Sequence, residues 1–220
     1  MPLDRDILAQ VDAQLVDRYS TRLQKFGVDP KTLGWDNSAN QRARFAVARR
    51  LLPENLMSLT DIGCGFADFY SELQPHYPNL RYTGVDINSD LLVEAQRRHP
   101  EVRFVRHNIV DSIDPALRAQ WVCAFGVMNF RFREFNNYEF AETLIRSAFD
   151  LAEEGLVVDM LSERLTPEYP REDFVFYYSP TRMLEFAFEL TPHVQLVHDY
   201  AAIPQREFIL VLRRRAWSAT

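Results

Sequence analysis

A glycine-rich turn at the end of an apolar run is the part of this sequence best suited to hold a ligand. The segment reads Asp61-Ile62-Gly63-Cys64-Gly65, and a helical pattern follows it. Glycine adopts positive φ easily and has no Cβ, so a ligand can lie directly against the main chain. A strand, a tight turn and a helix in this order therefore predict a binding site.

The position three residues after Gly65 carries a carboxylate. A dinucleotide-binding turn has the pattern G-x-G-x-x-G, in which the third glycine lets the helix pack closely on the strand beside a pyrophosphate. Here that position is Asp68. An acid disfavours a pyrophosphate but is compatible with a ligand that carries an ammonium or sulfonium group. An NAD-linked oxidoreductase is therefore the weaker hypothesis for this turn.

Residues 81–87 form a second short apolar segment, in which Asp86 lies 21 residues after Gly65. At this spacing the acid at the end of the second strand reaches a ribose diol. With both segments in place, the chain resembles the class I S-adenosylmethionine (SAM)-dependent methyltransferases. The resemblance extends from about Met57 to Arg213.

The resemblance implies SAM as the cofactor. It places the turn around the methionine and ribose parts, Asp86 at the ribose hydroxyls, and Asn108 with Ile109 at the adenine. Gly126 would allow close approach of SAM, and Arg44 would pair with the SAM carboxylate. The implied cofactor residues are Asp61, Gly63, Gly65, Phe66, Asp86, Ile87, Asn108, Ile109, Gly126 and Arg44.

Candidate catalytic residues follow the third, fourth and fifth expected strands. Asn129 is the candidate for holding the acceptor, since an amide orients a polar group but cannot take its proton. His107 and Tyr178 complete the set. Other candidate general bases are Asp159, Glu163 and His198. Each candidate has a structural role as its alternative. Methyl transfer from SAM needs mainly positioning, so the absence of an obvious catalytic triad does not count against an enzyme.

Strands and helices alternate after residue 55, which predicts an α/β fold. We expect a three-layer sandwich with a seven-stranded, mostly parallel sheet and an antiparallel last strand, as in the family that the chain resembles. Five strands are expected near 57–62, 81–86, 102–106, 120–125 and 155–160, and the last two near 194–200 and 207–212, joined through Ile203-Pro204. Helices are expected near 67–74, 89–98, 113–118, 138–152 and 181–190.

The first part of the chain is expected to be a helical lid, residues 1–54, ahead of a SAM-binding core, residues 55–215. Apolar residues recur at three- and four-residue steps from Asp4 to Phe26, which is typical of an amphipathic helix. Lid residues that could contact the methionine end of SAM are Tyr19, Trp35, Gln41 and Arg44. The aromatic segment within 162–179 is expected to wall the acceptor or to be core: Phe174, Phe176, Tyr177 and Tyr178.

Composition limits the partners. The 220 residues carry 25 basic and 31 acidic side chains, a formal net charge of −6, which disfavours a nucleic-acid surface. Two cysteines, Cys64 and Cys123, indicate no disulfide framework and suit a cytoplasmic protein. No apolar run is long enough to span a bilayer, and no ligand set with metal-site spacing is present. A monomer or homodimer is expected.

These features predict a SAM-dependent methyltransferase that acts on a small-molecule acceptor, with O- or N-methylation preferred. A SAM-binding or regulatory protein without catalysis is the first alternative, because such a protein could keep Gly63, Gly65 and Asp86. The NAD-linked oxidoreductase is the second.

Overall fold

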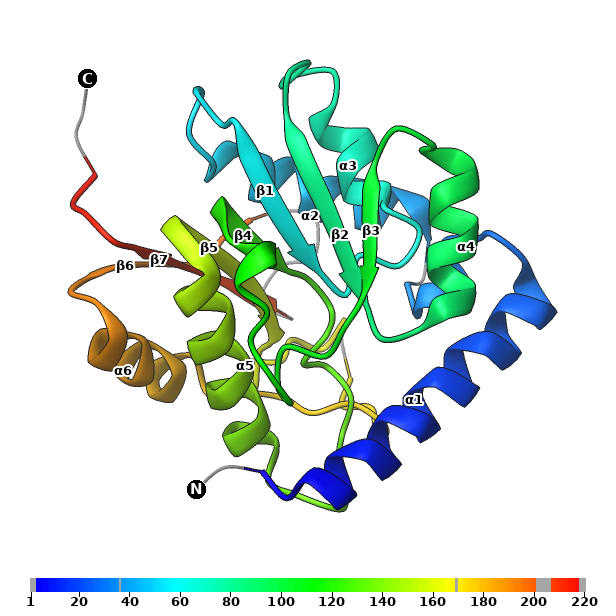
Figure 1. Ribbon diagram of the computed structural model, residues 1–220. Coiled ribbons are helices and arrows are strands. Elements are labelled where there is room, and N and C mark those ends of the chain that lie inside the picture. Colours follow the sequence, from blue (N-terminus) through cyan, green and yellow to red (C-terminus); the bar gives the residue numbers. More distant parts are fainter. Residues whose placement is uncertain (1–2, 36, 169, 201–206, 218–220) are drawn as a thin grey trace.

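The computed structural model describes residues 3–35, 37–168, 170–200 and 207–217 (Figure 1). Within them a seven-stranded sheet has the order β3-β2-β1-β4-β5-β7-β6. The strands are β1 (Ser58–Ile62), β2 (Arg81–Asp86), β3 (Arg103–Arg106), β4 (Ala119–Ala124), β5 (Ala152–Leu161), β6 (His193–Val197) and β7 (Glu207–Arg213).

The first five strands are paired in parallel, and only β7 runs against its neighbours. In the register, Asp61 of β1 lies beside Gly84 of β2 and beside Cys123 of β4. The predicted three-layer α/β sandwich with an antiparallel last strand is confirmed.

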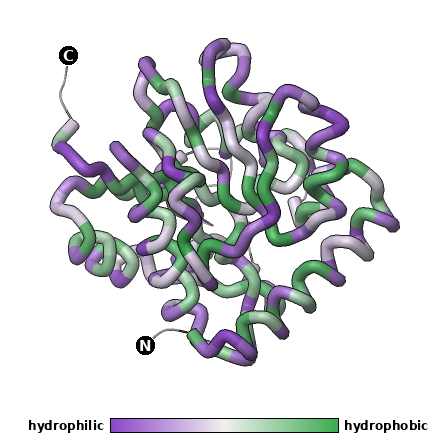
Figure 2. The backbone as a smooth tube through the Cα atoms, viewed as in Figure 1, coloured by the Kyte–Doolittle hydropathy of each residue, from purple (hydrophilic) through white to green (hydrophobic). Residues whose placement is uncertain are grey.

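Helices cover both faces of the sheet. They are α1 (Arg5–Phe26), α2 (Ser38–Arg50), α3 (Asp68–Leu73), α4 (Ser89–Arg98), α5 (Asn137–Leu151) and α6 (Pro180–Leu190), with 3₁₀ turns η1 (Pro30–Leu33) and η2 (Pro115–Leu117). One core cluster joins α5 and α6 to one face, and a second joins α2 and α3 to the other. Apolar (green) stretches run through the strands, and purple segments concentrate in the peripheral loops (Figure 2).

Helix α1 starts and ends where the sequence predicts, and both N-terminal helices are capped by side chains. The Asp4 carboxylate accepts hydrogen bonds from the backbone of Asp6 and Ile7, and Gly27 ends α1 with φ 66°. Asn37 caps α2 by accepting from the Asn40 N–H group. Helix α1 then runs below the tips of β2 and β3 in Figure 1, at the edge of the sheet where the parallel strands end.

Three boundaries differ from expectation. The helix expected near 113–118 is wrong: only the turn η2 forms, because Pro115 starts it and β4 already begins at Ala119. Strand β5 starts three residues before its expected residue 155, and β6 ends at Val197 instead of near 200. The expected connection through Ile203-Pro204 lies outside the described residues.

Candidate cofactor and acceptor pocket

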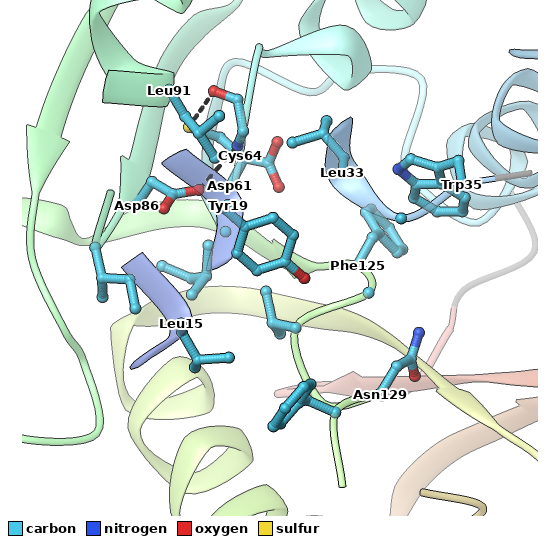
Figure 3. Close-up of a pocket in the computed structure, with 18 of the residues that line it drawn as sticks. Leu15, Tyr19, Leu33, Trp35, Asp61, Cys64, Asp86, Leu91, Phe125 and Asn129 are labelled. Carbon is cyan, nitrogen blue, oxygen red and sulfur yellow. Dashed lines mark hydrogen bonds between the residues drawn. The ribbon is translucent and has the colours of Figure 1, made fainter. Parts of the chain in front are cut away.

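A cavity of about 310 Å³ opens at the carboxyl ends of β1, β2 and β4. Strand β1 lies between β2 and β4, so β2 and β3 extend the sheet on one side of β1, and β4 and β5 extend it on the other. Ligands of open α/β sheets bind at this switch point. Helix α1, η1 and α2 supply the opposite wall, together with loops after β4 and β5. Figure 3 shows the Tyr19 ring in the middle of the pocket, between Asp86 and the Phe125–Asn129 side.

The turn after β1 follows a backbone path that favours glycine. Gly63 and Gly65 have φ 71° and 53°, and Ala67 follows with φ 58°. The N–H groups of Gly63 and Cys64 both donate to the Val85 carbonyl, at 2.7 and 3.1 Å, which fixes the turn to β2.

Both glycines are also closely covered. A Cβ on Gly63 would lie 2.0 Å from a methyl carbon of Val127, and a Cβ on Gly65 would lie 2.9 Å from a methyl carbon of Leu33. Val127 belongs to the loop after β4, and Leu33 to η1. Because they lack a Cβ, the two glycines let Val127 and Leu33 approach the backbone of the turn.

Asp86 is held by the same turn. The Gly65 N–H group donates to one carboxylate oxygen at 3.0 Å, and the Asn88 N–H group donates to the other at 2.9 Å. Burial raises the pKa of Asp86, and these backbone donors oppose that rise. A carboxylate has about four acceptor positions, so Asp86 can accept further hydrogen bonds from a ligand in the pocket.

Two other acids at the floor have protein partners. The Tyr82 hydroxyl donates to the buried carboxylate of Asp61, and burial raises the pKa of Asp61 to about 7 despite this bond. Asp68 accepts from the Gln41 amide at 3.0 Å and pairs with Arg98 at 2.7 Å. Asp68 thus connects α3 to α2 of the cover.

The side chain of Asn108 joins the floor to α1. Its amide donates to the Asp12 carboxylate at 2.7 Å, while its oxygen accepts from the Val110 N–H group at 2.9 Å. Burial raises the pKa of Asp12. Ile109 beside it is buried and lines the cavity.

Arg44 lines the pocket, but its guanidinium is occupied by the protein. Its Nε donates to Glu207 at 2.5 Å and lies 3.5 Å from Asp159, while its Nη2 also contacts Glu207. The Trp35 ring centroid lies 3.9 Å from the guanidinium carbon. The expectation of a free Arg44 that pairs with the SAM carboxylate is therefore corrected: the residue forms a buried internal ion pair.

The loop after β4 approaches the pocket through Gly126, which has φ 73°. Its N–H group donates to Asp159 at 2.6 Å. Asn129 follows, and its side-chain oxygen is buried without a hydrogen-bond partner among the described residues. Its backbone carbonyl accepts from Phe176 at 2.9 Å, which connects this loop to the segment after β5.

Two predicted site residues lie outside the pocket. Tyr178 is buried in the core and its hydroxyl donates to the Met128 carbonyl at 2.9 Å, so its proposed catalytic role is corrected to a structural one. The buried side chain of Phe66 does not line the cavity either.

His107 lines the cavity, and its ring nitrogen lies 2.8 Å from the Ser112 carbonyl. The three rival bases also lie off the cavity lining: Asp159, Glu163 and His198.

The remaining predicted positions come together. The cavity lining includes Asp61, Gly63, Gly65, Asp86, Ile87, Asn108, Ile109, Gly126, Asn129, Arg44, Tyr19, Trp35, Gln41 and Phe174. Sequence reasoning missed Asp12 and Arg18 of α1, which also line it. A signal for Asp12 was present: it lies four residues after Leu8 and three before Leu15, on the apolar face of the helix.

Among the described residues, no three His, Cys, Asp or Glu side chains gather closely enough to hold a metal ion. In the same part of the chain, no helix combines the length and apolar character needed to cross a membrane.

The sheet order and a pocket at its switch point define a Rossmann-like α/β protein. Residues 60–152 match the family model described as a methyltransferase domain. Structures with the same fold include magnesium protoporphyrin IX methyltransferase from Synechocystis, solved with bound S-adenosylhomocysteine (SAH), at 15% identity and TM-score 0.64. That match covers 96% of this chain and 100% of that one.

An O-methyltransferase family protein from Burkholderia thailandensis matches at 13% identity and TM-score 0.61, over 94% of this chain and 71% of that one. Sequence relatives include two trans-aconitate 2-methyltransferases. That of Afipia carboxidovorans is 28% identical over 37% of this chain and 35% of its own length. That of Escherichia coli is 34% identical over 31% and 28%.

The chain thus spans about a third or less of the length of these two relatives. Residues 60–152 thus match a methyltransferase domain, and the chain has the fold of the class I SAM-dependent methyltransferases that its sequence resembles.

Proposed function

We propose that this protein transfers a methyl group from SAM to a small-molecule acceptor, with O- or N-methylation preferred. The observation that carries the proposal is the glycine turn after β1 with Asp86 facing the same cavity at the sheet switch point. We also propose residues 1–54 as a lid and 55–215 as the SAM-binding core.

The residues present fit SAM. Gly63 and Gly65 line the cavity without side chains of their own, so a ligand can lie against the main chain of the turn. Asp86 retains acceptor positions for a ribose diol, and Asn108 with Ile109 lies beside it for the adenine. The Asp86 carboxylate, which accepts hydrogen bonds only from backbone N–H groups among the described residues, suits a ligand with an ammonium and a sulfonium.

When bound, SAM supplies an electrophilic methyl group on a positively charged sulfur. The chain's own contribution is position and exclusion of water. Gly126 gives room for close approach on the acceptor side, and the Asn129 amide orients a polar group of the acceptor without accepting its proton. Helix α1 and η1 line the pocket, and in the proposed lid role they would shield it from solvent.

A small acceptor is supported by the size of the cavity, about 310 Å³, and by the negative net charge. The names of the trans-aconitate relatives also favour a small molecule. The two buried thiols, Cys64 and Cys123, support a cytoplasmic location, and a monomer or homodimer remains our prediction.

Incubation of the purified protein with methyl-tritiated SAM and a panel of small acids, phenols and amines tests the proposal. We expect label transfer to at least one acceptor, with formation of SAH. Absence of SAM binding in calorimetry would contradict the proposal. Binding without transfer to any acceptor would favour the regulatory alternative instead.

A further inference from the structure

Arg18 is a cation on the pocket wall that the proposed reaction has not used. It lies on α1 one residue before Tyr19, and its side chain lines the cavity. The guanidinium carbon lies 5.4 Å from the ring centroid of Phe130 and 6.0 Å from that of Phe174. Phe130 follows Asn129 in the loop after β4, so Arg18 faces the acceptor side.

The charge of Arg18 is not neutralised by the described part of the protein. No carboxylate of a described residue lies within ion-pair distance of it, and its guanidinium forms no hydrogen bond there. Arg44, the other arginine of the lining, is by contrast paired with Glu207 and lies close to Asp159. A half-buried arginine with free donors is a site for an anion.

The surroundings of Arg18 are aromatic. The Phe174 side chain is 54% exposed although it lines the cavity, so its ring can be covered by a ligand. An arginine beside aromatic rings keeps the N–H groups at its edge available for a planar carboxylate. Glu172 lies on the same wall and has contacts of its own.

The two sides of the pocket therefore differ in charge. Three carboxyl groups lie at the floor, where a positively charged cofactor is expected: Asp86 of β2, the buried Asp61 of β1, and Asp68 of α3, which is paired with Arg98. Arg18 of α1 lies beside Phe130 and Phe174, which belong to the loops after β4 and β5, on the wall opposite the floor. This division separates the cation that donates the methyl group from an anion that receives it.

We propose that the acceptor is a small organic acid, whose carboxylate binds the Arg18 guanidinium and whose flat or apolar body packs on Phe130 and Phe174. This inference rests on the proposed methyltransferase function, because it assigns the other substrate of the same pocket. It concerns the anchoring carboxylate and leaves open which atom of the acid accepts the methyl group.

Calorimetric titration of the SAH-saturated protein with acids and their neutral amides tests the inference. The probes are benzoate against benzamide and cinnamate against cinnamamide, with trans-aconitate as a further acid. SAH binding is measured first on the same sample, so a failure there refutes the proposed function. Failure of the acids after SAH has bound refutes the acceptor class alone.

We expect at least one acid to bind about tenfold more tightly than its amide. Arg18→Gln should remove this preference and leave amide binding unchanged, and Arg18→Lys should keep part of it because it retains the charge. Arg97→Gln removes the same charge from the exposed face of α4 and should change nothing. Equal binding of acids and amides, no acid binding, or a preference that survives Arg18→Gln would overturn the inference.

Discussion

The floor and the cover of the pocket are built in different ways. The floor, residues 61–68 with Asp86, is held by backbone hydrogen bonds between neighbouring strands and their turn. The cover, residues 5–50, reaches the rest of the protein through polar side chains: Asp12 to Asn108, Gln41 to Asp68, and Arg44 to Glu207. A floor of this kind is preformed, whereas the cover depends on a few separate contacts that substitutions can remove one at a time.

The largest loss of stability is expected at the buried ion pair that joins the cover to the sheet. Arg44→Met leaves two fully buried carboxylates, Asp159 and Glu207, without their cation. Removal of one partner from a buried ion pair typically lowers the free energy of unfolding by about 3–5 kcal/mol. Urea unfolding at pH 7.5 should show this loss, with a smaller deficit at pH 5.5, because burial raises the pKa of Asp159 to about 7 and this carboxyl binds a proton at the lower pH.

Arg49→Met is the matched control for that change. Arg49 lies on the same helix and pairs with Glu72 at 3.3 Å in a partly exposed position. Such pairs contribute about 0–1 kcal/mol. Equal losses for the two variants would show that the buried pair does not fix the cover.

The next effect concerns the floor. Gly63→Ala combines a positive φ with a Cβ only 2.0 Å from Val127. The left-handed backbone costs about 1–2 kcal/mol and the steric overlap about 1–3 kcal/mol more. Gly34→Ala controls for the backbone alone, because Gly34 has φ 85° and no atom lies within 4 Å of the position that its Cβ would take. Thermal unfolding should separate them, and indistinguishable curves would mean that Val127 moves away freely.

The pH dependence of stability probes the floor as well. Asp61 has a pKa of about 7, raised from 3.8 mainly by burial. Between these values the folded state binds more protons than the unfolded state, so this group's stabilising contribution is lost as pH rises toward and through 7. Asp61→Asn keeps an acceptor for Tyr82 but does not titrate.

Urea unfolding from pH 4.5 to 7.5 should therefore show that the free energy of unfolding falls less steeply with pH, or rises more steeply, for Asp61→Asn than for the wild type. His99, whose pKa is lowered chiefly by burial, acts in the opposite direction but is present in both proteins. Parallel pH curves would show that Asp61 is ionised throughout this range.

The smallest effect is expected at the contact between α1 and the floor. Asp12→Ala removes the acceptor for the Asn108 amide at a partly exposed site. We expect SAH affinity to fall about threefold to tenfold, as for loss of about one hydrogen bond. Asp17→Ala, on the exposed side of α1, should bind SAH like the wild type. If Asp12→Ala lowered the SAH affinity as much as Asp86→Asn does, the division between floor and cover would be contradicted.

The floor was largely predictable from the sequence because its signals are local. The turn at Gly63 and Gly65, and Asp86 at the end of the next strand, follow from spacing within one strand–helix–strand unit. The mostly parallel sheet with an antiparallel last strand followed from the alternation of elements, from the two final strands and from the family resemblance. The error at residues 113–118 arose because apolar spacing alone does not show that β4 starts at Ala119.

The cover was predictable as helices but not as a wall of the site. The partner of Arg44 lies 163 residues away, and that of Asp12 lies 96 residues away. No local pattern specifies such pairs, so Arg44 was assigned to a ligand and Arg18 was overlooked. Tyr178 was misassigned for a related reason, since an aromatic cluster in sequence does not show which rings face the core.

Titration of SAH into the wild type and Asp86→Asn tests the central claim most directly. Asp86→Asn keeps the shape of the side chain but loses the charge and acceptor capacity at the floor. Glu94→Gln, at a half-buried position of α4 outside the cavity lining, controls for loss of charge. We expect one SAH per chain for the wild type and Glu94→Gln, and an affinity at least about tenfold weaker for Asp86→Asn. Unchanged binding by Asp86→Asn, or no binding by the wild type, would contradict this account.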